Sequence, residues 1–590
     1  MEPAKLKLNE EDNINTHDAI NDDDDEDNST SVQSSPNKSN SRSPVSNGNL
    51  EREKSLGLIE EQNLQDTEIT DFNENSNEDE EDYTSMFYIL KNLAPNFGSA
   101  FFYYIIGFLE THFIGQQKDV ELLDGIGLAL TYTTLLFYNQ GLGISEALAV
   151  LCSKCNGSKN YKMINIYTKQ ARFLTFIYSL LYFIINLTVL DKLLYFLAPN
   201  AAVINISRTY ILWTMPSLLL ELLFEVTAKF GESQLTYKPV IFGLISALIV
   251  NPVLCYFMLS YFKLGVWGCI ITTNVTSVVK ILVITFTLNF LVKRSEEEKE
   301  SSGIFDFKDF FKDFKKNVII VITCVWCTFM GSGGQAITGF IAVQLGVIEY
   351  AKYIVLMNMT NIFVILQYSL YNTCCILVGN LVGINKPKEI KILMRNFFII
   401  TTVITSMTVL MINVLHGPIT FFFSELDDIQ GDSILFEIVI LTVGEMLNCY
   451  QQVSNGLVIG LEKIKRASLV AFICYFFILP SLSYLFGIYF DFGLMGIMFA
   501  FLTCHVFGSA TLGVIIWFLD LQKCCIEYKI TSQLELEVEE KKLELGEGDL
   551  NNKDDDAKSM NSVTNISNLD SNAINIDSKD KKANMLAQLI

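Results

Sequence analysis

Twelve apolar runs of about 20 residues dominate the middle of this 590-residue chain. Inside a bilayer every backbone polar group must find its partner within the protein, so a run of this length forms a membrane-spanning helix. The sequence therefore predicts an all-α integral membrane protein with twelve transmembrane helices. The predicted spans cover residues 93–115, 123–151, 172–190, 209–231, 239–260, 265–292, 318–343, 349–379, 396–415, 433–460, 467–488 and 494–519.

The net charge of -22 belongs to the two ends of the chain. Residues 1–82 carry -18 and residues 527–590 carry -6, which leaves the segment between them at +2. Polar, acidic ends of this kind bury too little apolar surface to offset the entropy of folding, so both are predicted to be disordered tails. The acidity also argues against a nucleic-acid partner.

Basic residues are distributed unevenly over the loops between the predicted spans. With both tails placed in the cytoplasm, the internal loops hold 21 lysines and arginines and the external loops hold 5. Because positively charged loops stay on the cytoplasmic side of a membrane, both termini are predicted to be cytoplasmic. The membrane itself is expected to be the plasma membrane or that of an endomembrane organelle.

The two halves of the membrane segment repeat each other. The stretches NPVLCYFMLSYFKLGVWG and LPSLSYLFGIYFDFGLMG share Pro, Tyr and two Gly at a constant offset of 228 residues. A second pair is GSKNYK from Gly157 and GINKPK from Gly383. The repeat predicts two parallel six-span lobes, 83–292 and 318–526, joined by a basic cytoplasmic loop, 293–317. In transporters built from repeats, the substrate site lies near the middle of the membrane.

One carboxyl group stands inside the first predicted span, in the stretch GFLETHFIG at residues 107–115. A charge in hydrocarbon is costly, so such a residue usually faces a partner, a cavity or a proton path. Glu110 is therefore the first candidate for a functional side chain. The alternative is a glutamate that caps the helix or reaches the interface at its external end.

Further charged side chains stand inside other predicted spans. Glu146 lies in span two. Glu221 and Glu225 are one helical turn apart in span four, where neighbouring carboxyl groups tend to share one proton. Lys229, one turn further on, offers Glu225 an ion pair instead. Lys280 in span six either extends its ammonium to the interface or meets a partner in a cavity.

Spans five and ten carry neutral and acidic candidates. Asn251 directly precedes a proline, which removes one backbone hydrogen bond and exposes a carbonyl, as at many ion sites. Its alternative is a kink residue whose hydrogen bonds are satisfied. Glu445 lies three residues before Asn448, on a similar face of the helix. Glu445 either supplies a charge to a site or pairs with solvent near the helix end.

The order and spacing of four segments resemble the multidrug and toxin extrusion (MATE) family of eukaryotic type. GFLETHFIG is similar to its first-span motif, Gly-Phe-Val-Asp-Thr-x-Phe-Val-Gly, and LCSKCNGSKNYKMINIYTKQA resembles its Ser-Gln-x-x-Gly-Ala-x-Asn loop. VGNLVGINKPKEIK is close to Val-Gly-Asn-x-Leu-Gly-Ala-Gly, and NGLVIGLEKIKRA falls on Ser-Gly-Val-Leu-Arg-Gly. The resemblance implies two pseudo-symmetric six-helix bundles that open alternately to each side of the membrane.

The same resemblance gives roles to individual residues. Glu110 stands at the position of the functional first-span aspartate, and Asn251 stands where several bacterial members carry an acid. Asn448 falls where many eukaryotic members have Asp or Glu, and Gln451 matches a family Gln. Glu146 lies three residues from the position at which relatives carry an Asp in span two.

The seventh span departs from the family pattern. Its stretch MGSGGQAITGF lacks the two acids of eukaryotic relatives, and Gln335 is the strongly polar residue that remains. This departure bears on the proton-coupled export of organic cations that is typical of those relatives. The residues expected to bind protons or substrate are Glu110, Asn251, Glu445, Asn448, Gln451, Glu146, Glu225 and Gln335.

The expected function is a secondary active multidrug exporter that exchanges organic, often cationic, compounds for H+ or Na+. Such a protein needs no cofactor besides the coupling ion, has a small organic molecule and the lipid bilayer as partners, and is expected to be monomeric. A lipid or lipid-linked flippase of the same superfamily and a non-transporting receptor or scaffold are the alternatives. A membrane enzyme is not expected, because three of the four histidines, His112, His416 and His505, lie in or beside spans without acid or zinc-motif partners.

Overall fold

The computed structural model describes residues 83–117, 119–197, 200–290, 310–423 and 434–533. The predicted tail 1–82, nearly all of the tail 527–590 and most of the loop 293–317 lie outside these ranges. Their disorder and the division into two lobes stay predictions. Every regular element within the described ranges is helical, which confirms the all-α class.

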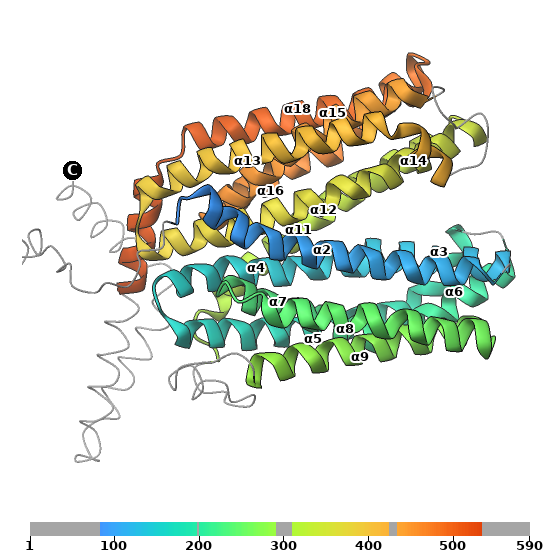
Figure 1. Ribbon diagram of the computed structural model, residues 1–590, viewed down its shortest axis with the longest axis horizontal. Coiled ribbons are helices and arrows are strands. Elements are labelled where there is room, and N and C mark those ends of the chain that lie inside the picture. Colours follow the sequence, from blue (N-terminus) through green and yellow to red (C-terminus); the bar gives the residue numbers. More distant parts are fainter. Residues whose placement is uncertain (1–82, 118, 198–199, 291–309, 424–433, 534–590) are drawn as a thin grey trace, which may run out of the picture. The chain divides into compact units, whose positions relative to one another are not determined.

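The first half of the chain forms helices α2 to α9, and the second half forms α11 to α18 (Figure 1). The first half comprises α2 Met86–Gly115, α3 Val120–Thr133, the π-helical turn η1 Thr134–Tyr138, α4 Asn139–Gly157, α5 Tyr161–Leu197, α6 Ala201–Trp213, α7 Met215–Ser233, α8 Lys238–Cys255, η2 Tyr256–Tyr261 and α9 Val266–Phe290. The second half comprises α11 Phe314–Val343, α12 Val347–Ile384, α13 Pro387–Val414, α14 His416–Phe423, α15 Leu435–Gly460, α16 Ile464–Ala471, η5 Phe472–Ile478, α17 Leu479–Tyr484, η6 Leu485–Tyr489 and α18 Gly493–Trp517. A further helix over 521–533 passes the predicted start of the C-terminal tail at residue 527.

Nine helices within the described residues are long and apolar enough to cross a membrane, and the bent pair α6–α7 makes a tenth. Helices α2 and α15 are not among them, although they are 30 and 26 residues long. Both contain polar residues that lower their mean hydropathy, among them Asn96 and Glu110 in α2 and Glu445 and Asn448 in α15. The twelve-span topology therefore stays a prediction. The polar residues that lower the hydropathy of α2 and α15 include candidate site residues.

Two predicted spans have a different shape in the structure. The predicted span 172–190 is the middle of α5, which begins at Tyr161 because the polar segment before the span is also helical. The predicted span 209–231 is two helices, α6 and α7, which meet at an angle of 51°. Pro216 at the start of α7 lacks an amide hydrogen, so the hydrogen bonds of α6 do not continue into α7.

The internal repeat is visible in the backbone. Lys159 and Asn385 follow α4 and α12 in the left-handed conformation, with φ of 56° and 64°. In both turns the next amide donates to the carbonyl five residues back, which closes the helix end in a Schellman motif. Lys263 and Asp491, which are 228 residues apart, share φ values of 54° and 56° after equivalent π-helical turns. The structure therefore confirms the repeat found in the sequence.

Helix α4 of the first half packs against α11 and α12 of the second half. Glycines allow the backbones of α4 and α12 to touch. A Cβ atom on Gly157 would lie 2.1 Å from the carbonyl oxygen of Asn380, and one on Gly383 would lie 2.2 Å from that of Lys154. Small residues permit such close helix contacts in membrane proteins. The contact holds the ends of α4 and α12 together.

Candidate functional site

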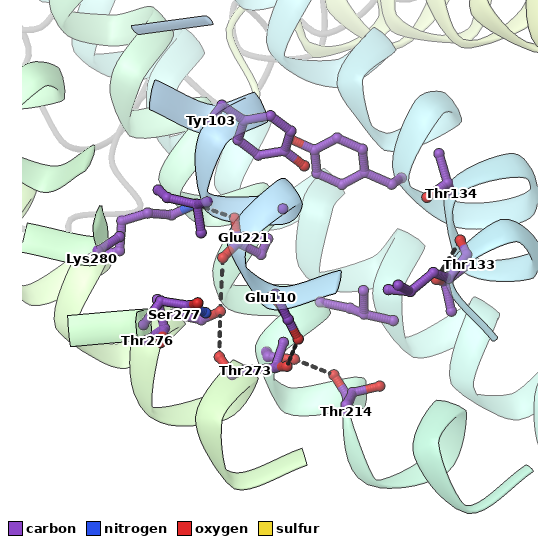
Figure 2. Close-up of a pocket in the computed structure, with 18 of the residues that line it drawn as sticks. Tyr103, Glu110, Thr133, Thr134, Thr214, Glu221, Thr273, Thr276, Ser277 and Lys280 are labelled. Atoms are coloured by element: carbon purple, nitrogen blue, oxygen red, sulfur yellow. Dashed lines mark hydrogen bonds and ion pairs between the residues drawn. The ribbon is translucent and has the colours of Figure 1, made fainter. Parts of the chain in front are cut away.

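A cavity of about 200 Å³ lies within the first half of the chain, between α2, α3, α7, α8 and α9 (Figure 2). Its principal charged and hydrogen-bonding side chains are Glu110, Asn251, Glu221, Thr273, Ser277 and Lys280. Helix α9 supplies three of them at intervals of three or four residues, so they share one helical face. This polar stripe in an apolar span is the sequence signal for Thr273 and Ser277, which were not among the predicted site residues.

Glu110 on α2 lines the cavity. The Thr273 hydroxyl donates a hydrogen bond of 3.0 Å to Oε1 of Glu110, and the Tyr210 hydroxyl lies 3.3 Å from the same threonine oxygen. Asn251, whose side chain is 1% exposed, lines the cavity from α8. The structure thus brings together Glu110 and Asn251, two of the predicted site residues, while their function stays a prediction.

Glu221 on α7 and Lys280 on α9 form an ion pair in the cavity wall. The Lys280 ammonium contacts Oε2 of Glu221, and the Ser277 hydroxyl donates to Oε1 over 2.7 Å. Figure 2 shows these side chains in a row that leads through Thr273 to Glu110. Of the two sequence interpretations of Lys280, the structure selects a partner in a cavity.

Glu225 lies one turn beyond Glu221 and contacts one of two stacked tyrosines. The Tyr138 hydroxyl donates to Oε1 of Glu225 over 3.2 Å, and the Tyr138 ring is stacked on Tyr103 with 5.9 Å between centroids. Neither sequence interpretation of Glu225 includes this hydrogen bond from Tyr138. Glu221 is instead neutralised by Lys280, and the ammonium of Lys229 is turned to other partners.

Lys229 belongs to a buried cluster that joins the two halves, here called the clasp: Asn96, Lys229, Glu232 and Asn372. Its ammonium lies 2.9 Å from Oε2 of Glu232 and 2.6 Å from Oδ1 of Asn372 on α12. The Asn372 amide donates to Glu232 over 2.9 Å and to Asn96 on α2 over 2.7 Å. All four side chains are buried. The clasp is therefore a polar connection between α2, α7 and α12.

Glu146 and Gln335 are among the predicted residues that lie outside the cavity lining. Glu146 on α4 contacts the Tyr371 side chain on α12, so it belongs to the contact between the halves. Gln335 on α11 is exposed and is not part of the cavity lining. Gln335 is the strongly polar residue of its stretch in span seven, and its role stays a prediction.

The remaining predicted residues meet in the second half of the chain. Glu445 accepts hydrogen bonds from Gln367 over 2.6 Å and from Asn448 over 3.2 Å. On the next turn of α15, the Gln451 amide donates to the Tyr475 hydroxyl over 3.3 Å. Nδ1 of His505 lies 3.4 Å from Oε1 of Gln451. This buried network is separate from the cavity, and sequence reasoning did not assign Gln367, Tyr475 or His505 to it.

Apolar helices in two repeated halves, with a charged cavity inside one of them, define the class of multi-pass membrane transporters. The sequence profile of the MatE family matches residues 95–257 and 326–485, one segment in each half. Together these segments make up more than half of the chain. The protein belongs to the MatE family.

Known relatives agree with this assignment. Multidrug and toxin extrusion protein 1 of Xenopus tropicalis is 21% identical over 461 residues, which are 77% of this chain and 78% of the relative. Protein DETOXIFICATION 49 of Arabidopsis thaliana is 22% identical over 379 residues, 62% of this chain and 72% of the relative. The crystal structure of the eukaryotic MATE transporter AtDTX14 superposes with a TM-score of 0.66 at 16% identity, over 74% of this chain and 97% of that one. This similarity shows a shared fold.

Family membership makes the chain a transporter and not an enzyme. Proteins of this family need no cofactor and bind small molecules within the membrane. Within the described ranges, no three His, Cys, Asp or Glu side chains are arranged to hold a metal ion.

Proposed function

We propose that this protein exports small organic compounds by alternating access and exchanges them for H+ or Na+ at Glu110. The observation that carries the proposal is the setting of the Glu110 carboxyl, which lines the cavity and accepts a hydrogen bond from Thr273. In the described part of the chain it forms no ion pair with a lysine or arginine, whereas Glu221 does. Glu110 is thus the cavity carboxyl available to a coupling ion.

The chemistry of this setting supports ion exchange. A carboxylate surrounded by apolar helices is stabilised by a proton or a metal cation, and losing that ion restores an unfavourable charge. The hydrogen bond from Thr273 stabilises the charged form and offsets part of the cost of burying it. Loss of the ion from Glu110 would therefore change the net charge of the cavity lining from neutral to negative, and binding of the ion would reverse this change.

Alternating access also requires contacts between the halves that break and re-form. The clasp supplies such contacts, because Asn372 on α12 binds Lys229 and Glu232 on α7 and Asn96 on α2. The buried charges of Lys229 and Glu232 neutralise each other while the halves are together. In the opposite state of the transporter, water would replace these partners.

The test is transport by the purified protein in liposomes, with proton flux recorded as substrates are added, in the presence and absence of sodium. Glu110→Gln should abolish ion-coupled transport, because the amide carries no charge to exchange. The matched control is Glu121→Gln, the same substitution at an exposed position in the first turn of α3. Coupled transport that survives Glu110→Gln unchanged would overturn the role of Glu110.

A lipid flippase and a non-transporting receptor predict different results in the same liposomes. A flippase would move a labelled lipid between leaflets, with no proton flux on addition of soluble compounds. A receptor would show neither activity.

A further inference from the structure

We propose that Lys280 is a tethered cation that fills the position in which an organic cation would bind, so that the cavity takes uncharged polar compounds. This inference rests on the proposed function and refines its substrate class. It departs from the cationic substrates that the resemblance to multidrug exporters implies. Carboxylate and aromatic groups surround the Lys280 ammonium, and they already have partners within the protein.

The Lys280 ammonium is surrounded as a bound organic ammonium would be. It contacts the Glu221 carboxylate, lies 4.4 Å from the centroid of the Phe224 ring and lies 5.6 Å from that of Tyr103. A carboxylate combined with aromatic faces is the usual chemistry for binding organic cations. In this chain the cation comes from α9 of the protein itself.

An external cation would have to compete with Lys280 for Glu221. Each carboxylate oxygen of Glu221 already has a partner, Ser277 at Oε1 and Lys280 at Oε2. The Lys280 residue is 4% exposed, so a displaced ammonium would remain largely buried without its counter-charge. Breaking a buried ion pair in this way is strongly unfavourable. Lys280 therefore disfavours the binding of an external cation at Glu221.

The opposite wall of the cavity is uncharged and polar. Figure 2 shows Thr133 and Thr134 facing the side on which Glu221 and Lys280 lie, and Thr214 also lines the cavity. The hydroxyls of Thr133 and Thr214 donate to backbone carbonyls of Ala129 and Tyr210, so what they offer a ligand is an acceptor oxygen. Compounds with hydroxyl or amide groups can therefore donate hydrogen bonds to this wall of the cavity.

The experiment measures binding and transport of tetraethylammonium, a permanent cation, by the full-length protein in detergent and in liposomes. The wild-type protein should be neither stabilised against heat by tetraethylammonium nor able to carry it. Lys280→Met frees Glu221 between two aromatic rings, so its affinity for tetraethylammonium should rise about tenfold or more. Lys192→Met, at an exposed position, is the matched control and should behave as the wild type does.

A double variant decides whether Glu221 is the group that Lys280 occupies. Glu221→Gln combined with Lys280→Met removes both charges, keeps the volume and should lose the gained affinity. Transport of tetraethylammonium by the wild type, or a gain that persists in the double variant, would overturn the inference. If Lys280→Met does not fold, the wild-type measurement alone still decides. Loss of all coupled transport in the wild type would contradict the proposed function instead, since the inference concerns only the charge of the ligand.

Discussion

The ammonium of Lys229 on α7 lies 2.6 Å from the amide oxygen of Asn372 on α12, although 143 residues separate them in the chain. This contact joins the two halves of the protein in a buried setting. The ammonium also lies 4.9 Å from the centroid of the Tyr368 ring, on the same helix as Asn372. A charged side chain of the first half is thus held jointly by a carboxylate of its own half and by polar and aromatic groups of the other.

The first prediction concerns the clasp. Lys229→Met leaves the buried Glu232 carboxylate without its cation, so the free energy of unfolding should fall by about 3 kcal/mol or more. Lys352→Met removes the partner of Glu349 in a more exposed ion pair and should cost less than about 1 kcal/mol. Thermal unfolding of the two purified variants measures the difference. Equal stability of both variants would contradict a structural role of the clasp.

The second prediction concerns the contact between α4 and α12. Gly157→Ala places a Cβ atom against the backbone oxygen of Asn380, which forces the helices apart. The expected loss of stability is about 1–3 kcal/mol, together with altered transport, because the same surfaces must separate during alternating access. Gly127→Ala is the control, since open space surrounds that position. If Gly157→Ala changed neither the stability nor the transport, the two helices would be able to move apart here without a loss of free energy, and the prediction would be wrong.

The third prediction concerns the hydroxyl that holds Glu110. Thr273→Val preserves the shape of the side chain and removes the donor, so the charged form of Glu110 loses about 1–2 kcal/mol of stabilisation. The pH dependence of coupled transport should shift toward higher pH, because the proton is then bound more firmly. Thr273→Ser restores the donor and should restore the original profile. An unchanged profile in Thr273→Val would exclude this hydrogen bond from the coupling.

The fourth prediction concerns pH and the turn between α15 and α16, which lies outside the predicted spans. Burial opposes ionisation of Glu462, but the cations of Lys154, Lys316 and Lys463 outweigh it, so the pKa of Glu462 is lowered. Lys154 belongs to the first half and lies 2.8 Å from Oε2 of Glu462, so this ion pair also connects the halves.

The sign of the pH effect follows from the lowered pKa. The stabilisation is fully present above the unfolded pKa of about 4.3 and is lost as the pH falls through the lower folded value. Thermal unfolding measured from neutral to acidic pH should therefore show a loss of stability in the wild type. Glu462→Gln removes the titrating group and should lose less on acidification. Identical pH profiles for the two proteins would contradict the ion pair.

Part of the site was accessible from sequence, because some of its signals are local. An acid within an apolar run stands out by itself, and Glu110 does line the cavity. Glu445, Asn448 and Gln451 follow one another on α15 at helical spacing, and they do belong to one buried network. The contact of Glu225 with Tyr138 was not predicted, because an i, i+4 neighbour was weighed without the partners that other segments bring.

The sequence by itself determined the helical class, the length and order of the apolar runs and the repeat, because run length and a constant offset are properties of the linear chain. Only the tertiary structure decided which charges meet. Lys280 reaches Glu221 across 59 residues, and Lys229 reaches Asn372 across 143. Such pairings depend on how each helix is rotated about its axis and which helices it packs against. No spacing within a single helix contains that information.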